Sequence, residues 1–245
     1  MATVVQEPAR PRVPSAPIDI LNTDLAKLYT HIHPVLLLSV YAFKFNSIVE
    51  NPVTALSETL VAVGILQVVF SAICLPPTGG SATPLGDKRK PGEKKKGAPS
   101  PVASAVNGTV IPAFLALVLA IIAGIPILGV LLVLFGAPIS THWEHTALCA
   151  AHISFLTAIP LTYVHGVDGS TWREIVSLEL PIDEVYGCLI GTMLGAWLGA
   201  VPIPLDWDRE WQKWPITIVT GAYIGFAVGK SVGGTLLKGK TVLFG

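Results

Sequence analysis

Apolar residues in this chain gather in long runs that are separated by short polar segments. Each run is close to the roughly 20 residues that a helix needs to cross the hydrocarbon core of a bilayer. The six runs cover residues 28–49, 53–75, 110–135, 145–165, 184–203 and 215–237. The pattern predicts an all-α, polytopic integral membrane protein with about six transmembrane helices, the first of which serves as an uncleaved signal anchor.

Composition supports a membrane protein and excludes other classes. Of the 245 residues, 51% are hydrophobic and only 13% are charged, and the mean hydropathy is +0.63, outside the usual range of soluble domains. The net charge is zero, so no basic excess points to nucleic acid as a partner. Cys74, Cys149 and Cys188 lie in apolar runs without paired spacing, and we expect free, buried thiols.

The polar segments predict the orientation of the chain. Segment 76–109 is rich in Pro, Gly and Ser, and its lysines and arginines outnumber its acids, which is typical of a flexible cytoplasmic loop. An even number of spans then places both termini in the cytoplasm. We expect residues 1–27 to be disordered there, residues 28–75 to form the first two spans, and residues 110–245 to form the other four. Loop 204–214 is then lumenal.

Two ladders of glycines mark the last two predicted spans. In lipid, small residues let helix backbones approach closely, so glycines repeated every four residues predict helix-packing surfaces. The spacing of four drifts by about 40° per step, so each stripe winds around its helix. The ladders fit either an internal antiparallel hairpin or the docking of a partner's helix. They consist of Gly187, Gly191, Gly195 and Gly199, and of Gly221, Gly225, Gly229 and Gly233.

A polar segment, "PIPLDWDREWQKWP" at 202–215, joins these two spans. Its tryptophans are spaced by four and three, so they share one face if the loop makes a helical turn at the depth of the aromatic belt. Charges of both signs lie among them and suit a sugar, a phosphate headgroup or a partner's polar loop. The alternative is an internally paired cap, in which Asp206 or Asp208 binds Arg209 and Asp206 caps the turn. The candidate contact residues are Asp206, Trp207, Asp208, Arg209, Trp211 and Trp214.

Other polar residues allow competing interpretations. His142, Glu144, His145 and His152 open the 145–165 span, where two or three imidazoles could converge on a zinc ion or simply lie at the membrane interface. We expect no metal. Lys44 and Glu58 lie in or beside apolar spans, where charges are usually paired or functional, so they could pair in the bundle, or Lys44 could reach the interface.

No nucleophile elbow, P-loop or HExxH motif is present in the sequence. We therefore expect neither catalysis by this chain alone nor a cofactor. Two other functions stay open at this point. One is a small lipid-modifying enzyme that uses His142, Glu144, His145 and the acids of the loop. The other is a transporter of lipid headgroups that uses Glu58 and Lys44.

The polar segment and its flanks carry a family resemblance. Residues 195–229, "GAWLGAVPIPLDWDREWQKWPITIVTGAYIGFAVG", resemble the signature of the PIG-F family, and a fungal member in particular. Residues 131–150, "LLVLFGAPISTHWEHTALCA", resemble a second family segment, with Glu144 as its acidic residue. Together they cover the C-terminal half, whereas the N-terminal half matches only in its spans and basic loop.

This resemblance implies a multi-pass protein of the endoplasmic reticulum membrane. It implies an accessory subunit that stabilises larger catalytic partners, which transfer ethanolamine phosphate from phosphatidylethanolamine onto mannoses of the glycosylphosphatidylinositol (GPI) precursor. Those partners carry their own lumenal metal-dependent domain, so no metal chemistry is expected in this chain. The implied partners are the catalytic GPI ethanolamine phosphate transferase subunits and membrane lipids.

Overall fold

A computed structural model describes residues 15–78, 106–205 and 207–242, and every regular element in these ranges is a helix. Five helices are long and apolar enough to cross a membrane, which confirms the prediction of an all-α membrane protein. They are α1 (Asp24–Glu50), α2 (Pro52–Cys74), the composite helix Gly108–Leu134, α6 (Trp143–His165) and α9 (Ile216–Gly234).

The composite helix contains two π-helical turns, and each is followed by a segment with a proline near its start. The order is η1 (Val106–Val110), α4 (Ile111–Leu119), η2 (Ala120–Gly124) and α5 (Ile125–Leu134). The hydroxyl of Ser154, from α6, donates to the carbonyl of Ala120 at 2.8 Å, and such an insertion opens a helix locally. Because the π-helical turn η1 begins at Val106, the end of the predicted 76–109 loop is helical.

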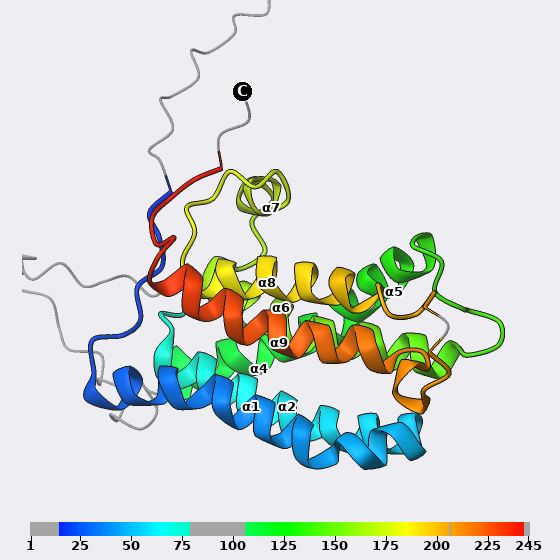
Figure 1. The fold of residues 1–245 in the computed structure, drawn as a ribbon. Coiled ribbons are helices and arrows are strands. Elements are labelled where there is room, and N and C mark those ends of the chain that lie inside the picture. The colour runs from blue at the N-terminus through cyan, green and yellow to red at the C-terminus, as the bar shows by residue number, and fades with distance from the viewer. Residues whose placement is uncertain (1–14, 79–105, 206, 243–245) are drawn as a thin grey trace, which may run out of the picture.

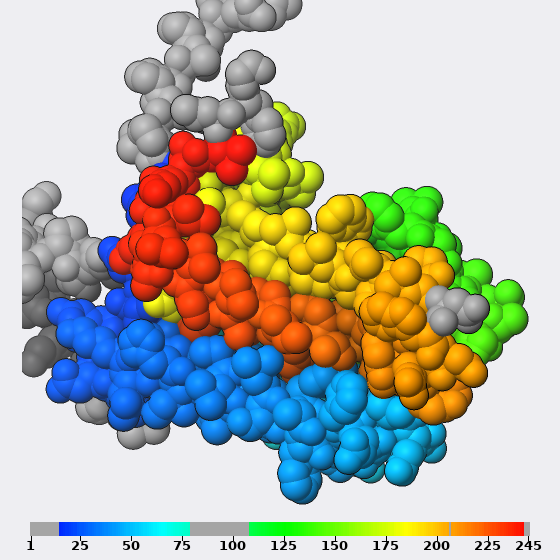
Figure 2. All heavy atoms as spheres, viewed as in Figure 1, coloured from blue at the N-terminus to red at the C-terminus, as the bar shows by residue number. Residues whose placement is uncertain are grey.

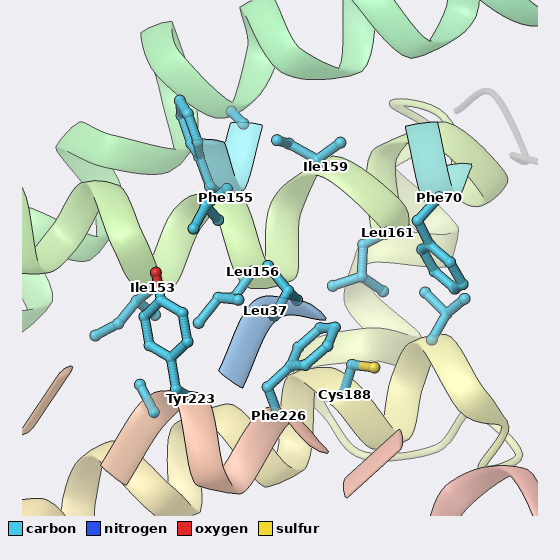
Figure 3. Close-up of a cluster of buried hydrophobic side chains, with 14 of the residues drawn as sticks. Leu37, Phe70, Ile153, Phe155, Leu156, Ile159, Leu161, Cys188, Tyr223 and Phe226 are labelled. Atoms are coloured by element: carbon cyan, nitrogen blue, oxygen red, sulfur yellow. The ribbon is translucent and has the colours of Figure 1, made fainter. Parts of the chain in front are cut away.

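Helix α6 lies at the centre of the bundle and packs against α2, α4, α5 and α9. Most of its residues are buried. In Figure 3, Leu156 of α6 lies beside Leu37 of α1 and Phe226 of α9, whereas Ile159 points to the opposite side of α6. Close van der Waals packing of this kind holds helices together in lipid, where burial of apolar surface between helices adds little.

The fifth predicted span is shorter than the sequence pattern indicates. Helix α8 (Glu184–Gly199) has 16 residues, so it is about 24 Å long at 1.5 Å per residue, against about 30 Å of hydrocarbon. Turns follow Gly199 because Pro202 and Pro204 cannot continue a helix. The connection to α9 therefore covers residues 200–215, and the predicted span 184–203 is wrong in its last four residues. Helix α7 (Gly169–Val176), which precedes α8, is a short helix that the sequence pattern did not predict.

The connections α1–α2, α5–α6 and α8–α9 lie at one end of the bundle, whereas residues 15–23, α7 and the end of α9 lie at the other (Figure 1). We expected residues 1–27 to be disordered, but residues 15–23 have a defined position in the structure. The amide of Leu21 donates to the carbonyl of Cys74 at 2.8 Å, and Asp19 pairs with Lys238 at 2.6 Å, which raises the pKa of Lys238. Residues 1–14 and most of the predicted 76–109 loop lie outside the described residues.

Asp183 joins the N-terminal segment to α8. One carboxylate oxygen accepts the amide of Tyr186 and caps the helix, and the other accepts the amide of Ile18, both at 2.8 Å. Burial raises the pKa of Asp183, and these two hydrogen bonds oppose that shift. The single side chain therefore stabilises the start of α8 and the position of residues 15–23 together.

Replacing Asp183 by alanine should lower the free energy of unfolding by about 1–2 kcal/mol, the cost of losing a helix cap. Thermal unfolding of the full chain in detergent measures this loss. The matched control is Asp168→Ala, which removes the exposed cap of α7. That variant should loosen α7 alone, so an equal loss of stability in both variants would contradict the role assigned to Asp183.

Candidate functional site

The two glycine ladders face each other along the whole α8–α9 hairpin, the most extensive contact between described helices. A Cβ atom added at Gly191 would lie 2.6 Å from the Cα of Gly229, and one added at Gly225 would lie 2.9 Å from the Cα of Gly195. Real Cβ atoms essentially never approach other atoms that closely. Helix contact at this distance therefore requires glycine, and the ladders serve the hairpin within this chain.

Because glycines supply no side chains, the α8–α9 seam leaves an apolar groove of about 660 Å³. All eight ladder glycines line it, together with Leu194 and Leu198 of α8 and Ile224 and Val228 of α9. Leu194 and Val228 are each more than half exposed, so the groove opens on the outer surface of the bundle. Figure 2 shows α8 and α9 side by side along the visible face.

A buried glutamine, and not the charged residues, holds the α8–α9 connection in shape. Gln212 donates from its side-chain amide to the carbonyls of Pro202 and Leu205, both at 2.8 Å. Its side-chain oxygen accepts the backbone amide of Arg209 at 3.0 Å. Sequence reasoning missed this role, because one neutral residue between charges gives no signal until the chain folds back on it.

The three loop tryptophans do not share one face. Only Glu210–Gln212 forms a helical turn, which is too short to align Trp207, Trp211 and Trp214. The rings of Trp207 and Trp211 lie 5.9 Å apart, and Trp207 is 52% exposed, whereas Trp214 packs against the core. The structure therefore places two of the three tryptophans together.

The loop charges are only partly paired. Lys213 pairs with Glu210, but no ion pair among the described residues involves Asp208 or Arg209. The alternative of an Asp208–Arg209 pair is therefore not seen, and Asp206 lies outside the described residues. An acid and an arginine of the loop stay available for an outside group.

The three histidines His142, His145 and His152 do not converge on one site. The rings of His142 and His145 lie 5.2 Å apart, but His152 is buried in the core. Its Nδ1 is 2.8 Å from the hydroxyl of Tyr223, and its Nε2 is 3.1 Å from the carbonyl of Leu56. Within the described ranges, no group of three His, Cys, Asp or Glu side chains is placed to hold a metal ion.

Two ion pairs join charged residues of different apolar helices. Lys44 and Glu58 pair at 2.7 Å between α1 and α2, and both side chains are partly exposed. The second pair, Lys230 with Glu184 at 2.6 Å, is largely buried. The hydroxyl of Thr30 accepts from Lys230 at 2.8 Å and donates to Glu184 at 2.7 Å. Sequence reasoning missed this second pair, although a lone lysine within an apolar, glycine-rich span was its signal.

Comparison with known proteins yields a family match and related proteins. Residues 32–234 match the model of the GPI biosynthesis protein family Pig-F. The glycosylphosphatidylinositol anchor biosynthesis protein 11 of Neurospora crassa is 46% identical over 91% of this chain and 80% of that protein. The protein of the same name in Aspergillus fumigatus is 45% identical over 89% and 83%.

A third relative has a different architecture. The PIGF/3-ketodihydrosphingosine reductase fusion protein of Schizosaccharomyces pombe is 32% identical over 80% of this chain and 34% of its own length. No solved structure matches the chain. The family match covers the bundle from α1 to α9 and confirms the resemblance found in the sequence. The chain belongs to the PIG-F family of GPI biosynthesis proteins.

Proposed function

We propose that this chain is a non-catalytic subunit that stabilises the ethanolamine phosphate transferases of GPI biosynthesis in the endoplasmic reticulum membrane. The observation that carries this proposal is the family match over residues 32–234, which includes nearly all of the membrane bundle. The described part of the chain consists of membrane helices and short connections. Such a subunit acts through its helix surfaces and connections.

The proposal includes an orientation. Both termini and the basic loop 76–109 face the cytoplasm, and the connection 200–215 faces the lumen. Two observations support it: the excess of lysine and arginine in the loop, and the position of both described chain ends at the same end of the bundle (Figure 1). The lumen is where a transferase would act on the precursor's mannoses.

The proposed contact with the catalytic subunit or with the lipid-linked glycan is the connection between α8 and α9. Gln212 ties this loop together through hydrogen bonds to Pro202, Leu205 and Arg209, and preorganisation of this kind lowers the ordering cost of binding. Trp207 offers an exposed aromatic face, and Arg209 offers a charge with no carboxylate partner among the described residues. The contact set is Asp206, Trp207, Asp208, Arg209, Trp211 and Trp214.

Affinity purification of the tagged full chain in mild detergent tests the function. We expect a large ethanolamine phosphate transferase to be recovered with the wild-type chain. Its absence would contradict the proposed function.

Variants of the loop test the site separately. Trp207→Ala or Arg209→Ala should lower recovery by about tenfold, because tryptophan and arginine anchor most interfaces. Lys213→Ala is the matched control, since Lys213 already pairs with Glu210 in the same loop. Equal recovery with all three variants would remove the loop from the contact while leaving the function standing.

The other two functions are not favoured. A lipid-modifying enzyme built on His142, Glu144, His145 and the acids of the loop draws support only from the approach of the His142 and His145 rings to 5.2 Å. A headgroup transporter would need charges inside the bundle, but Lys44 and Glu58 neutralise each other at a partly exposed edge. Membership of a GPI biosynthesis family points away from both.

A further inference from the structure

The groove along the α8–α9 seam has the form of a lipid site. It runs from Ile182 and Leu237 at one end to Pro202 and Trp211 at the other. Its floor is glycine backbone and its walls are Leu, Ile and Val side chains. An acyl chain is one methylene wide, so it can lie on the narrow glycine floor. A partner's helix is about 10 Å across, so it would contact the walls and leave the floor unfilled.

A polar group without a partner marks the end of the groove near the loop. Thr217, the second residue of α9, lines the groove and is 7% exposed. Its hydroxyl is buried and has no hydrogen-bond partner among the described residues, which is costly inside a membrane. Thr217 thus has a hydroxyl without a partner beside the groove, and the ester carbonyl of a lipid is an acceptor that suits it. An apolar ligand would leave it unsatisfied.

The α8–α9 connection, which lies at the Pro202–Trp211 end of the groove, carries charges of both signs. Trp211 lines the groove, and Asp208 and Arg209 precede it in the loop that Gln212 fixes. Neither charge forms an ion pair with another described residue. An arginine suits a phosphate, and a carboxylate suits an ammonium group. This combination is complementary to a zwitterionic headgroup and less so to an anionic one.

We propose that the α8–α9 groove binds one phospholipid with a zwitterionic headgroup. An acyl chain lies along the glycine floor, an ester carbonyl reaches Thr217, and the phosphate and ammonium groups lie at Arg209 and Asp208. The chain thereby holds a single ordered lipid at the surface of its C-terminal hairpin. This proposal rests on the groove and the loop and does not depend on the proposed function.

Native mass spectrometry of the full chain tests this site. The purified chain is equilibrated with equal amounts of phosphatidylcholine, phosphatidylethanolamine and phosphatidylglycerol, and the lipid retained after detergent washing is measured. We expect one zwitterionic lipid to be retained in preference to phosphatidylglycerol. Val228→Trp, which fills the groove from the α9 wall, should reduce retention by about tenfold, a change of about 1.4 kcal/mol in binding. Leu194→Trp tests the opposite wall in the same way.

Matched controls separate this site from ordinary annular lipid. Val61→Trp places the same ring on α2, at a residue that is 64% exposed and outside the groove, and should leave retention unchanged. Arg209→Gln should lower retention, and Lys213→Gln should not. Equal retention by Val228→Trp, Val61→Trp and the wild type would overturn the proposal, as would equal retention of phosphatidylglycerol.

The recovery of a transferase is read in the same preparations. A partner's helix in the groove predicts that Val228→Trp abolishes recovery while lipid retention stays at the wild-type level, and that result would also overturn the lipid site. Loss of lipid with unchanged recovery supports the lipid site and leaves the proposed function intact.

Discussion

Replacing Lys230 by methionine should lower the free energy of unfolding by about 3–5 kcal/mol, the usual cost of removing one partner from a buried ion pair. The Lys230 side chain is only 4% exposed and lies 2.6 Å from Glu184, which is 20% exposed. Its ammonium group also lies over the ring of Phe70, 4.0 Å from the centroid. Methionine keeps the packing but leaves Glu184 as an uncompensated charge. Thermal unfolding of the full chain in detergent measures the loss.

Two variants serve as controls for this prediction. Lys238→Met breaks an exposed pair with Asp19 and should cost about 0–1 kcal/mol. The double variant Lys230→Met/Glu184→Leu removes both charges and should recover most of the lost stability, because an apolar pair needs no compensation. If Lys230→Met and Lys238→Met cost the same, the buried pair does not have the role assigned to it.

Replacing Gly191 by alanine should destabilise the hairpin by about 1–3 kcal/mol, the cost of overpacking. The added methyl would lie 2.6 Å from the Cα of Gly229 and would also meet the carbonyl of Gly225. Both obstacles are backbone atoms, so α8 and α9 must move apart. Disulfide trapping between cysteines placed on the two helices, together with thermal unfolding, measures that separation.

The control is Gly129→Ala, in α5. An added methyl there would lie 3.9 Å from the Cβ of Ala150, an ordinary contact, so only the gain in helix propensity of about 1 kcal/mol should be seen. A loss at Gly129 equal to that at Gly191 would mean that the seam is not closely packed.

The sequence predicted the membrane helices well because span length and hydropathy are local properties. It left the partner of each glycine ladder open, since a small-residue stripe indicates close approach but does not say to which helix. The structure resolves this through geometry: α8 and α9 run antiparallel on either side of the connection 200–215, and their ladders lie in register. Similar stripes on distant helices would not have been resolved in this way.

Features that depend on tertiary contacts were missed. The end of α8 is an exception, because its signal is local: Pro202 and Pro204 end the helix although the apolar run continues past Gly199. Lys230 finds Glu184, 46 residues away, only in the folded bundle. In the candidate loop, the sequence pointed to the charged residues and the tryptophans as functional. The residue that holds the loop in shape is Gln212, whose side-chain contacts form only after folding.

Reconstitution of a catalytic ethanolamine phosphate transferase with and without this chain tests the accessory role most directly. The measurement is the transfer of ethanolamine phosphate to a GPI precursor, together with the half-life of the catalytic subunit in the same membranes. We expect no transfer by this chain alone and a longer half-life of the catalytic subunit when the chain is present. Transfer by the chain alone, or a half-life that is the same with and without it, would show that the chain is not an accessory subunit of this kind.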